Sequence, residues 1–404
     1  MDLTSGSPYW VLKNAQSEFH PPLERDHRCD VLVVGAGITA ALITRALVGE
    51  GVQVCLVDRR QVGWGSTSAS TALLQYEIDV ELQALARQFG LDDAVLAYRA
   101  CEEAVLALTR LARTFKRVDV RPMQSLYFSS RWYHDRRVRR EGALRQAQGF
   151  ALDCLDNAEL QERFGIDAGI GLLSAVAAEV DPVQLARCLL DAARRKGAQI
   201  FERSGVKEFA PTPRGVTVTL DNGKRIRCKH VVIAAGYESQ QFLSQRVARN
   251  RSSYAFVSDP VAGGLQSLEN CLAWESARPY LYVRSTADHR LIVGGEDDAI
   301  DIPFKRDASV WRKADILRKK FCSRFPRQSF TIAHAWAGTF AETADGLPFF
   351  GPHVQHGPRV HFAMAYGGNG ITYSAIGAEI IKGALGGRKH PCADLFSFER
   401  LQRQ

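Results

Sequence analysis

Hydrophobic and polar positions follow a regular order near the start of the chain. A short apolar run over residues 31–34 ends at Gly35, and residues 38–49 then carry apolar side chains at three- and four-residue spacing. A second apolar run over residues 52–57 closes on Asp58. These periods predict a strand, a glycine turn, an amphipathic helix and a second strand, all within about 30 residues.

Later segments alternate between helical and strand-like patterns. Helical spacing over residues 80–118 predicts a long helix, and a helix start at Asp181 precedes a predicted strand at residues 199–201. The turn residues 221–223 read Asp-Asn-Gly and separate two alternating runs, which is a strong hairpin signal. Strand-like alternation dominates residues 246–330, and a glycine-rich tail ends in a final helix.

The order of these patterns predicts an α+β chain with two interleaved domains. Ligand-type glycine segments occur near the N-terminus, in the middle and near the C-terminus, so we expect them to meet in one discontinuous nucleotide-binding domain. The sequence between them is expected to form a substrate domain built on an antiparallel sheet. We assign residues 24–80, 171–245 and 331–404 to the nucleotide-binding domain, and residues 81–170 and 246–330 to the substrate domain.

The glycine turn has the chemistry of a dinucleotide site. Gly35 allows the tight turn off the strand, and Gly37 lets a pyrophosphate approach the backbone, while Ala40 stands where a third glycine is usual. The helix N-terminus that follows offers free N–H groups and a partial positive charge to phosphates. Asp58 lies 21 residues beyond Gly37, where a carboxylate can accept hydrogen bonds from ribose hydroxyls. The alternative is a plain βαβ turn.

Composition narrows the class of protein. The 404 residues are 46% hydrophobic and 24% charged, which is typical of soluble globular proteins, and no apolar run is long enough to span a bilayer. Nine cysteines lie scattered without a C-x-x-C pair, which argues against a zinc or other metal site and against a disulfide framework. We therefore expect reduced thiols, a cytoplasmic location and no stable membrane insertion.

A net charge of +8 comes partly from an arginine-rich stretch over residues 131–145. Its spacing suits an exposed helix with a solvated face, and attraction of an acidic partner is the alternative interpretation. No nucleic-acid motif accompanies the stretch, so a nucleic-acid partner is not expected. The sequence leaves the oligomeric state open.

Several segments together resemble the D-amino-acid-oxidase-like flavoprotein family, which includes glycine oxidase, sarcosine oxidase and γ-glutamylputrescine oxidase. The segments read VLVVGAGITA from Val31, GWGSTSASTALL from Gly63, VVIAAG from Val231, TADGLPFFG from Thr343 and YGGNGI from Tyr366. The resemblance covers most of the chain. It implies an FAD/NAD(P)-binding Rossmann-like domain with one bound FAD.

The resemblance also assigns contacts to individual residues. The glycine turn and the neighbouring hydroxyls of Ser66 and Thr67 would hold the pyrophosphate, Asp58 the adenosine ribose, and Arg59 and Val206 the adenine. The segment from Thr71 would run beside the flavin ring. The candidate cofactor-binding residues are Gly35, Gly37, Ile38, Thr39, Asp58, Arg59, Gly65, Ser66, Thr67, Thr71, Ala72, Leu73, Val206, Ala235, Gly236, Gly367, Gly368, Asn369, Gly370 and Ile371.

Three positions depart from the family pattern. Phe340 stands where glycine oxidase has an arginine for the substrate carboxylate, which predicts that simple α-amino acids are poor substrates. Ile292 stands where monomeric sarcosine oxidase has a lysine that helps oxygen react, so a quinone or an electron carrier is an alternative acceptor to molecular oxygen. Gly338 replaces the cysteine that tethers the flavin in that enzyme, so FAD is expected to be non-covalent.

The expected activity is oxidation of a C–N bond in a small-molecule amine or N-substituted amino acid, with hydride transfer to flavin. An FAD-binding sensor or scaffold is the alternative outside enzymes. Alternation along residues 280–284 would place Tyr280, Tyr282 and Arg284 on one face of a strand, and Glu342 could anchor a second amino group of the substrate. The candidate catalytic residues are Tyr282, Arg284, Trp336, Phe340 and Glu342.

Overall fold

The computed structural model describes residues 2–14, 19–262, 264–299 and 301–402. The predicted strand–helix–strand unit is confirmed. The strands β3 (Val31–Val34) and β4 (Val54–Val57) pair in parallel, and the helix α2 (Ile38–Gly49) connects them. Every residue of both strands is buried. This burial explains why the two runs are apolar throughout instead of alternating, because strands covered on both faces need apolar residues at every position.

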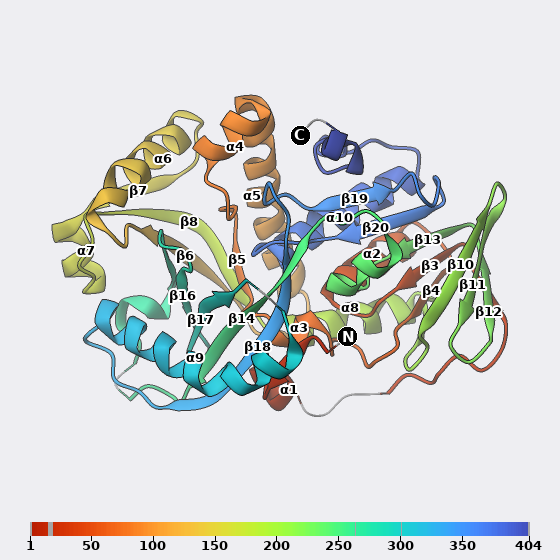
Figure 1. Ribbon diagram of the computed structural model, residues 1–404, viewed down its shortest axis with the longest axis horizontal. Helices are drawn as coiled ribbons and strands as arrows, with labels where there is room; N and C mark the ends of the chain where they lie inside the picture. The colour runs from red at the N-terminus through yellow and green to blue at the C-terminus, as the bar shows by residue number, and fades with distance from the viewer. Residues whose placement is uncertain (1, 15–18, 263, 300, 403–404) are drawn as a thin grey trace.

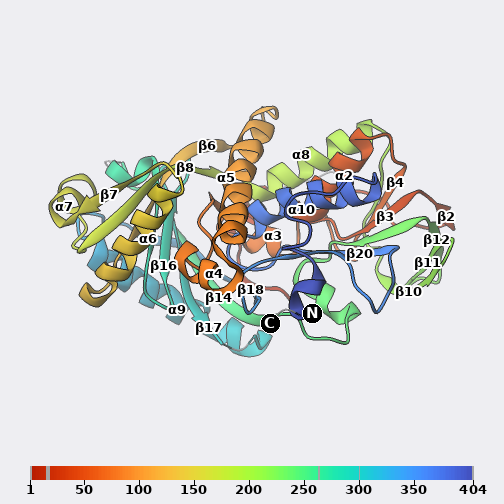
Figure 2. The same ribbon diagram turned by 90° about the horizontal axis from the view of Figure 1, so that it is seen from above.

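A six-stranded sheet contains this unit. It is parallel except at one edge, where β19 and β20 pair in antiparallel fashion. Figure 2 shows α2, α8 and α10 side by side on one face, and a small sheet of β10–β12 and β2 covers the other face. The further strands of the two sheets are β19 (Phe349–Pro352), β20 (Val360–Met364), β13 (His230–Ile233), β9 (Gln199–Phe201), β10 (Val206–Thr212), β11 (Gly215–Leu220), β12 (Arg225–Cys228) and β2 (His27–Arg28).

A ten-stranded, mostly antiparallel sheet forms the other half of the molecule (Figure 1). The long helix α9 (Pro303–Arg324) packs on one face of this sheet, and the helix α5 (Leu91–Arg113) contacts it from the side nearer the six-stranded sheet. Its strands are β1 (Thr4–Gly6), β18 (Ile332–Glu342), β14 (Arg249–Ser258), β17 (Leu291–Asp298), β16 (Leu281–Ser285), β15 (Cys271–Glu275), β6 (Val120–Phe128), β8 (Ile170–Val180), β5 (Leu73–Gln75) and β7 (Leu152–Asp156).

The predicted helices form with identifiable starts and stops. Asp181 caps α8, because its carboxylate accepts a hydrogen bond from the backbone N–H of Gln184 at 2.9 Å. The helical region expected over residues 80–118 consists of two helices, α4 (Leu82–Phe89) and α5, separated at Gly90, whose φ of +88° suits glycine. The remaining helices are α1 (Tyr9–Lys13), α3 (Ser66–Ala69), α6 (Asp135–Ala147), α7 (Asn157–Phe164), α8 (Pro182–Arg195) and α10 (Gly370–Leu385).

Two details differ from the sequence-based expectations. The strands β5, β8 and β18 hydrogen-bond within the ten-stranded sheet, although the proposed domain boundaries put their residues with the nucleotide-binding domain. The arginine-rich stretch forms α6 but is not solvated throughout. Arg145 is fully buried and pairs with Glu141 at 2.7 Å, so the exposed-helix prediction is wrong at this residue.

Within the part of the chain that the structure describes, no helix combines the length and the apolar character that crossing a bilayer requires.

Candidate active site at the meeting of the two sheets

A cavity of about 610 Å³ lies where the two sheets meet. Val34, Ala234 and Ala365 line it at the carboxyl ends of β3, β13 and β20, which is where open parallel sheets bind ligands. Every candidate cofactor-binding residue, from Gly35 to Ile371, lines this cavity. The fold therefore brings the predicted segments together, and their individual contacts with a cofactor stay predictions.

The glycine turn is shaped so that a ligand can lie against the backbone. Gly35 has a φ of +113°, and a Cβ there would stand 2.3 Å from the carbonyl oxygen of Ala234 on the neighbouring strand. A Cβ on Gly37 would lie 3.0 Å from Thr67 Oγ1. The first turn of α2 follows directly, so its N–H groups and the positive end of its dipole point toward the cavity.

Two hydroxyls face this turn. The Thr67 hydroxyl oxygen accepts a hydrogen bond from the backbone N–H of Ile38 at 3.0 Å, which ties α3 to the start of α2. Ser66 Oγ is buried, lines the cavity and has no hydrogen-bond partner among the described residues. A buried hydroxyl of this kind normally has a partner, so the site is suited to a bound group with acceptor oxygens, such as a phosphate.

Asp58 organises the end of β4. Its carboxylate accepts hydrogen bonds from the backbone N–H groups of Ala36 at 2.7 Å and Arg60 at 2.6 Å. Burial raises the pKa of Asp58, and these two N–H donors oppose that rise. Arg59 and Arg60 both pair with Glu238, which lies after β13, so a carboxylate that the sequence analysis missed fixes the two arginines at this end of the cavity.

Residues 69–72 form the wall between the two ends of the cavity, and side chains hold their carbonyl oxygens. The indole N–H of Trp336 donates to Ala69 O at 2.9 Å, and the indole N–H of Trp10 donates to Ser70 O at 2.6 Å. Arg284 Nη1 donates to the carbonyl oxygens of Thr71 at 3.2 Å and Ala72 at 2.9 Å. These donors fix the backbone that the family resemblance predicts to run beside the flavin ring.

This geometry corrects the role expected for Arg284. Its side chain is buried, 3.3 Å from Glu179, and it does not line the cavity. The predicted face of β16 was right, but the Thr71–Ala72 backbone lies between the guanidinium and the cavity. Arg284 is therefore a positioning residue rather than a catalytic one.

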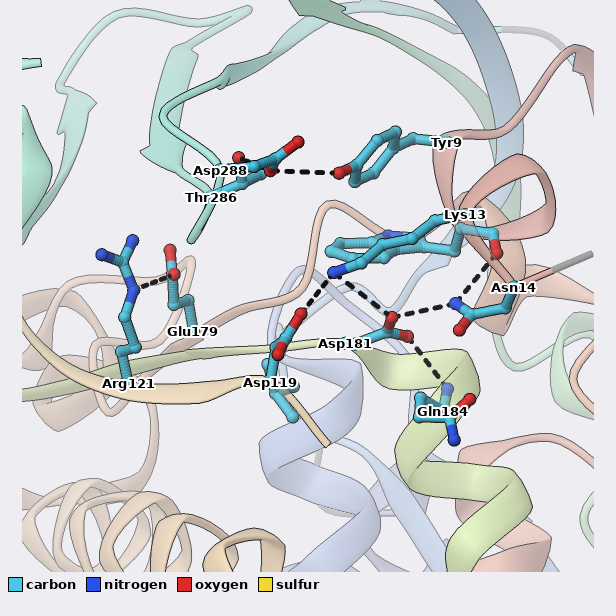
Figure 3. A network of polar contacts seen from close by, with 12 residues as sticks. Tyr9, Lys13, Asn14, Asp119, Arg121, Glu179, Asp181, Gln184, Thr286 and Asp288 are labelled. Carbon is cyan, nitrogen blue, oxygen red and sulfur yellow. Dashed lines mark hydrogen bonds and ion pairs between the residues drawn. The ribbon is translucent and has the colours of Figure 1, made fainter. Parts of the chain in front are cut away.

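A polar network joins the N-terminal helix α1 to the residues just before β6 and α8 and to the loop between β16 and β17 (Figure 3). The hydroxyl of Tyr9 donates to Asp288 at 3.4 Å, and the ammonium of Lys13 donates to Asp119 at 2.5 Å. The amide of Asn14 donates to Asp181, the cap of α8, at 2.9 Å. This network holds Trp10 against Ser70.

The far end of the cavity is an aromatic chamber. Tyr282, Trp336 and Phe340 line it as predicted, and the rings of Tyr280 and Tyr282 lie 5.7 Å apart. Glu342 does not line the cavity. Its carboxylate instead pairs with Arg251 at 2.6 Å on the adjacent strand, so the structure gives no support to the expected contact between Glu342 and the substrate.

Two carboxylates in the chamber were missed by the sequence analysis. Asp79 accepts a hydrogen bond from the backbone N–H of Gly368 at 2.7 Å, and the hydroxyl of Tyr280 lies 3.4 Å from Asp79 Oδ1. Asp297, near the end of β17, is the second. Asp79 follows the cavity-lining segment that begins at Gly63 by only a few residues, but nothing in the alternation along the chain marks Asp297.

Comparison with known proteins places these features in a family. The family model described as FAD dependent oxidoreductase matches residues 30–383. The chain is 25% identical over 390 residues to the glycine oxidase of Bacillus licheniformis, covering 93% of this chain and 98% of that one. It is 23% identical to the γ-glutamylputrescine oxidoreductase of Escherichia coli strain K12, covering 89% and 84% of the two chains.

A solved structure has the same fold. The L-proline dehydrogenase from P. horikoshii superposes with a TM-score of 0.77 at 16% identity, over 94% of this chain and 99% of that one. The family match spans most of the chain and includes both the glycine turn and the last helix of the cavity. The chain belongs to the FAD dependent oxidoreductase family, an oxidoreductase family whose Rossmann-like domain binds FAD.

Proposed function

We propose that this protein oxidises the C–N bond of an amine or an N-substituted amino acid with non-covalently bound FAD. The observation that supports this most is a single cavity with a glycine-lined nucleotide cradle at one end and a chamber of Tyr282, Trp336 and Phe340 at the other. Bound FAD supplies the acceptor for a hydride from the carbon next to the nitrogen. The imine that results hydrolyses to a carbonyl compound and an amine.

The residues at the nucleotide end of the cavity have the space and the hydrogen-bonding groups that FAD requires. Gly37 leaves room at the start of α2, and Ser66 Oγ offers a hydrogen bond that no described residue takes up. The pyrophosphate would be held by Gly35, Gly37, Ser66 and the N-terminus of α2, and the ribose would be held by Asp58. Among the cavity-lining residues that the structure describes there is no cysteine, which agrees with a flavin that is not covalently attached.

The chamber fits an amine better than a simple α-amino acid. Arg59, Arg60 and Lys207 line the nucleotide end of the cavity, whereas the described residues that line the aromatic end include no lysine or arginine. A substrate carboxylate would therefore lack a charged partner there. The aromatic rings exclude water, and a neutral amine can give up hydride without a dedicated base.

The electron acceptor is proposed to be molecular oxygen. One observation favours a dehydrogenase as the second candidate. Ile292, at the position of the lysine that assists oxygen in sarcosine oxidase, is fully buried and carries no charge. A quinone or a carrier protein would then reoxidise the flavin.

The cytoplasmic location expected from the scattered cysteines, all nine of which are unpaired, stays a prediction.

Anaerobic mixing tests this function. The flavin-loaded protein is mixed with a panel of polyamines, sarcosine, D-amino acids, alcohols and hydroxy acids, and the flavin absorbance is followed. We expect amines to bleach the flavin and glycine to do so poorly, and the rate of recolouring in air to separate an oxidase from a dehydrogenase. Bleaching by an alcohol or hydroxy acid but by no amine would refute C–N oxidation, and bleaching by no compound would favour a sensor.

A further inference from the structure

Asp297 places a carboxylate in the aromatic end of the cavity, where the Ser253 hydroxyl is a hydrogen-bond partner of the carboxyl group. It lines the cavity, and its Oδ1 atom is buried without a hydrogen-bond partner among the described residues. A carboxylate oxygen that is buried without a partner is costly, and proteins keep one where a ligand completes it. The proposed C–N oxidation needs no such group, so Asp297 requires an explanation of its own.

A β-bulge turns Asp297 toward the cavity. In the pairing of β14 with β17, Ser252 lies opposite Asp298 but Tyr254 lies opposite Gly295, so β17 has one residue more than its partner strand. Gly295 and Glu296 have φ values of +136° and +56°, as expected where a strand carries an inserted residue.

The extra residue changes the face on which the following side chains lie. Gly294 faces Tyr282, because a Cβ there would meet the tyrosine ring at 2.4 Å. Strict alternation would then put Asp297 on the opposite face, against α9. The bulge reverses this, so Asp297 shares the face of Gly294 and Tyr282 and lines the cavity.

The neighbours of Asp297 on the strand are paired on the other face. Asp298 accepts hydrogen bonds from Lys313 of α9 at 2.7 Å and from the hydroxyl of Tyr254 at 2.7 Å. Glu296 pairs with Lys320 of the same helix. The basic residues of α9 are therefore on the far side of the sheet from Asp297, and the cation that acts on Asp297 from the near side is Arg278.

The surroundings of Asp297 suit a cation. Tyr280 and Tyr282 present their rings to the same chamber, and aromatic faces attract ammonium groups. Asp79 adds a second negative charge near Tyr280. Arg278 is the nearby cation, and it is already engaged, since it lies 4.6 Å over the Tyr280 ring and donates to the backbone oxygen of Asp79 at 2.7 Å.

We propose that Asp297, with Asp79 and the rings of Tyr280 and Tyr282, binds a second, positively charged amino group of the substrate. The preferred substrates are then diamines or polyamines, in which one nitrogen reacts and a distant ammonium binds Asp297. This inference rests on the proposed C–N oxidation and moves the cation anchor expected at Glu342 to Asp297. A charge-assisted hydrogen bond in a water-poor chamber gives the selectivity.

A matched pair of amines tests the subsite. 1,4-Diaminobutane and n-pentylamine have the same number of non-hydrogen atoms and differ by an ammonium in place of a methyl group. The rate of anaerobic flavin bleaching divided by the apparent Kd is measured for each with the flavin-loaded enzyme. We expect the wild type to favour the diamine by about 10-fold or more, as for a hydrogen bond to a charged group. Asp297→Asn should abolish the preference.

Asp298→Asn is the matched control, since it removes the same charge one residue away on the face toward α9. It should keep the preference for the diamine. Equal rates with both amines in the wild type, or an unchanged preference in Asp297→Asn with a normal flavin spectrum, would overturn the subsite while leaving amine oxidation intact. Should Asp297→Asn fail to bind flavin, the wild-type comparison still decides. Bleaching by no amine at all would overturn the proposed function and this subsite with it.

Discussion

Gly37 is a residue at which an added side chain is expected to damage the cofactor site directly. A Cβ there would lie 3.0 Å from Thr67 Oγ1, and a larger side chain would enter the space of the pyrophosphate. Gly37→Val should weaken FAD binding by ~10- to 100-fold, the usual effect of overpacking a tight site. The measurement is flavin content after purification and titration with FAD. Gly49→Val is the control, because Gly49 is exposed with no atom within 4 Å of its Cβ position; equal loss in both variants would contradict the account.

The charge state of Asp297 gives a pH dependence. Burial raises the pKa of Asp297 to about 6, Asp79 and Glu342 add to this rise, and the Ser253 hydroxyl and Arg278 oppose it. The carboxyl is therefore neutral below this pH and ionised above it. Affinity for 1,4-diaminobutane should increase as pH rises through about 6 and then level off. Titration of the flavin spectrum between pH 5 and pH 8 measures it, and a flat profile in the wild type would argue against an ionised Asp297 as the anchor.

At the residue scale, sequence reasoning located the cofactor cavity better than the substrate chamber. Glycines and small hydroxyl residues form short motifs that can be recognised in the sequence, and every cofactor-binding residue predicted from such motifs lines the cavity. Arg284 and Glu342 were misjudged because alternation gives the face of a strand but not what covers that face. Asp297 was missed because the inserted residue at Gly295–Glu296 reverses the alternation.

At the element scale, α1 supports the cavity wall through one hydrogen bond. Trp10 is buried, and its indole N–H holds Ser70 O at 2.6 Å. Trp10→Phe keeps most of the ring but leaves that carbonyl without its donor, so we expect a loss of about 1–3 kcal/mol in the free energy of unfolding and weaker FAD binding. Chemical denaturation of the flavin-loaded protein measures the first effect. Leu12→Ala, at an exposed position of the same helix, should change stability by less than about 0.5 kcal/mol; a Trp10→Phe variant as stable as this control would show that the contact is unimportant.

The elements themselves were predictable where one face alone is buried or where a turn residue marks an end. The hairpin of β11 and β12 and the Asp181 cap of α8 are of this kind. No strand was predicted at β6, and its parallel pairing with β15, within a sheet that is otherwise largely antiparallel, was not expected. Such long-range pairing depends on which strands the fold brings together, and the local alternation of apolar and polar residues does not show which strands will pair.

At the scale of the whole molecule, the interleaved arrangement followed from glycine segments at three separated places in the chain. The proposed boundaries stay a prediction. The strands β5 and β18 lie in the large sheet and also carry residues that line the cavity, and β8 lies in the same sheet. The cavity therefore has walls from both sheets, and the nucleotide end and the aromatic end are parts of one space. This continuity is what lets one chain hold a cofactor and orient an amine beside it.

The central claim is flavin-dependent cleavage of a C–N bond, and product stoichiometry in a single anaerobic turnover tests it most directly. The flavin-loaded protein is mixed with an excess of 1,4-diaminobutane without oxygen, and reduced flavin, carbonyl product and ammonia are measured in the same sample. The account predicts one carbonyl and one ammonia for each flavin reduced. Flavin reduction without release of ammonia, or purified protein that contains no FAD and takes up none, would contradict it.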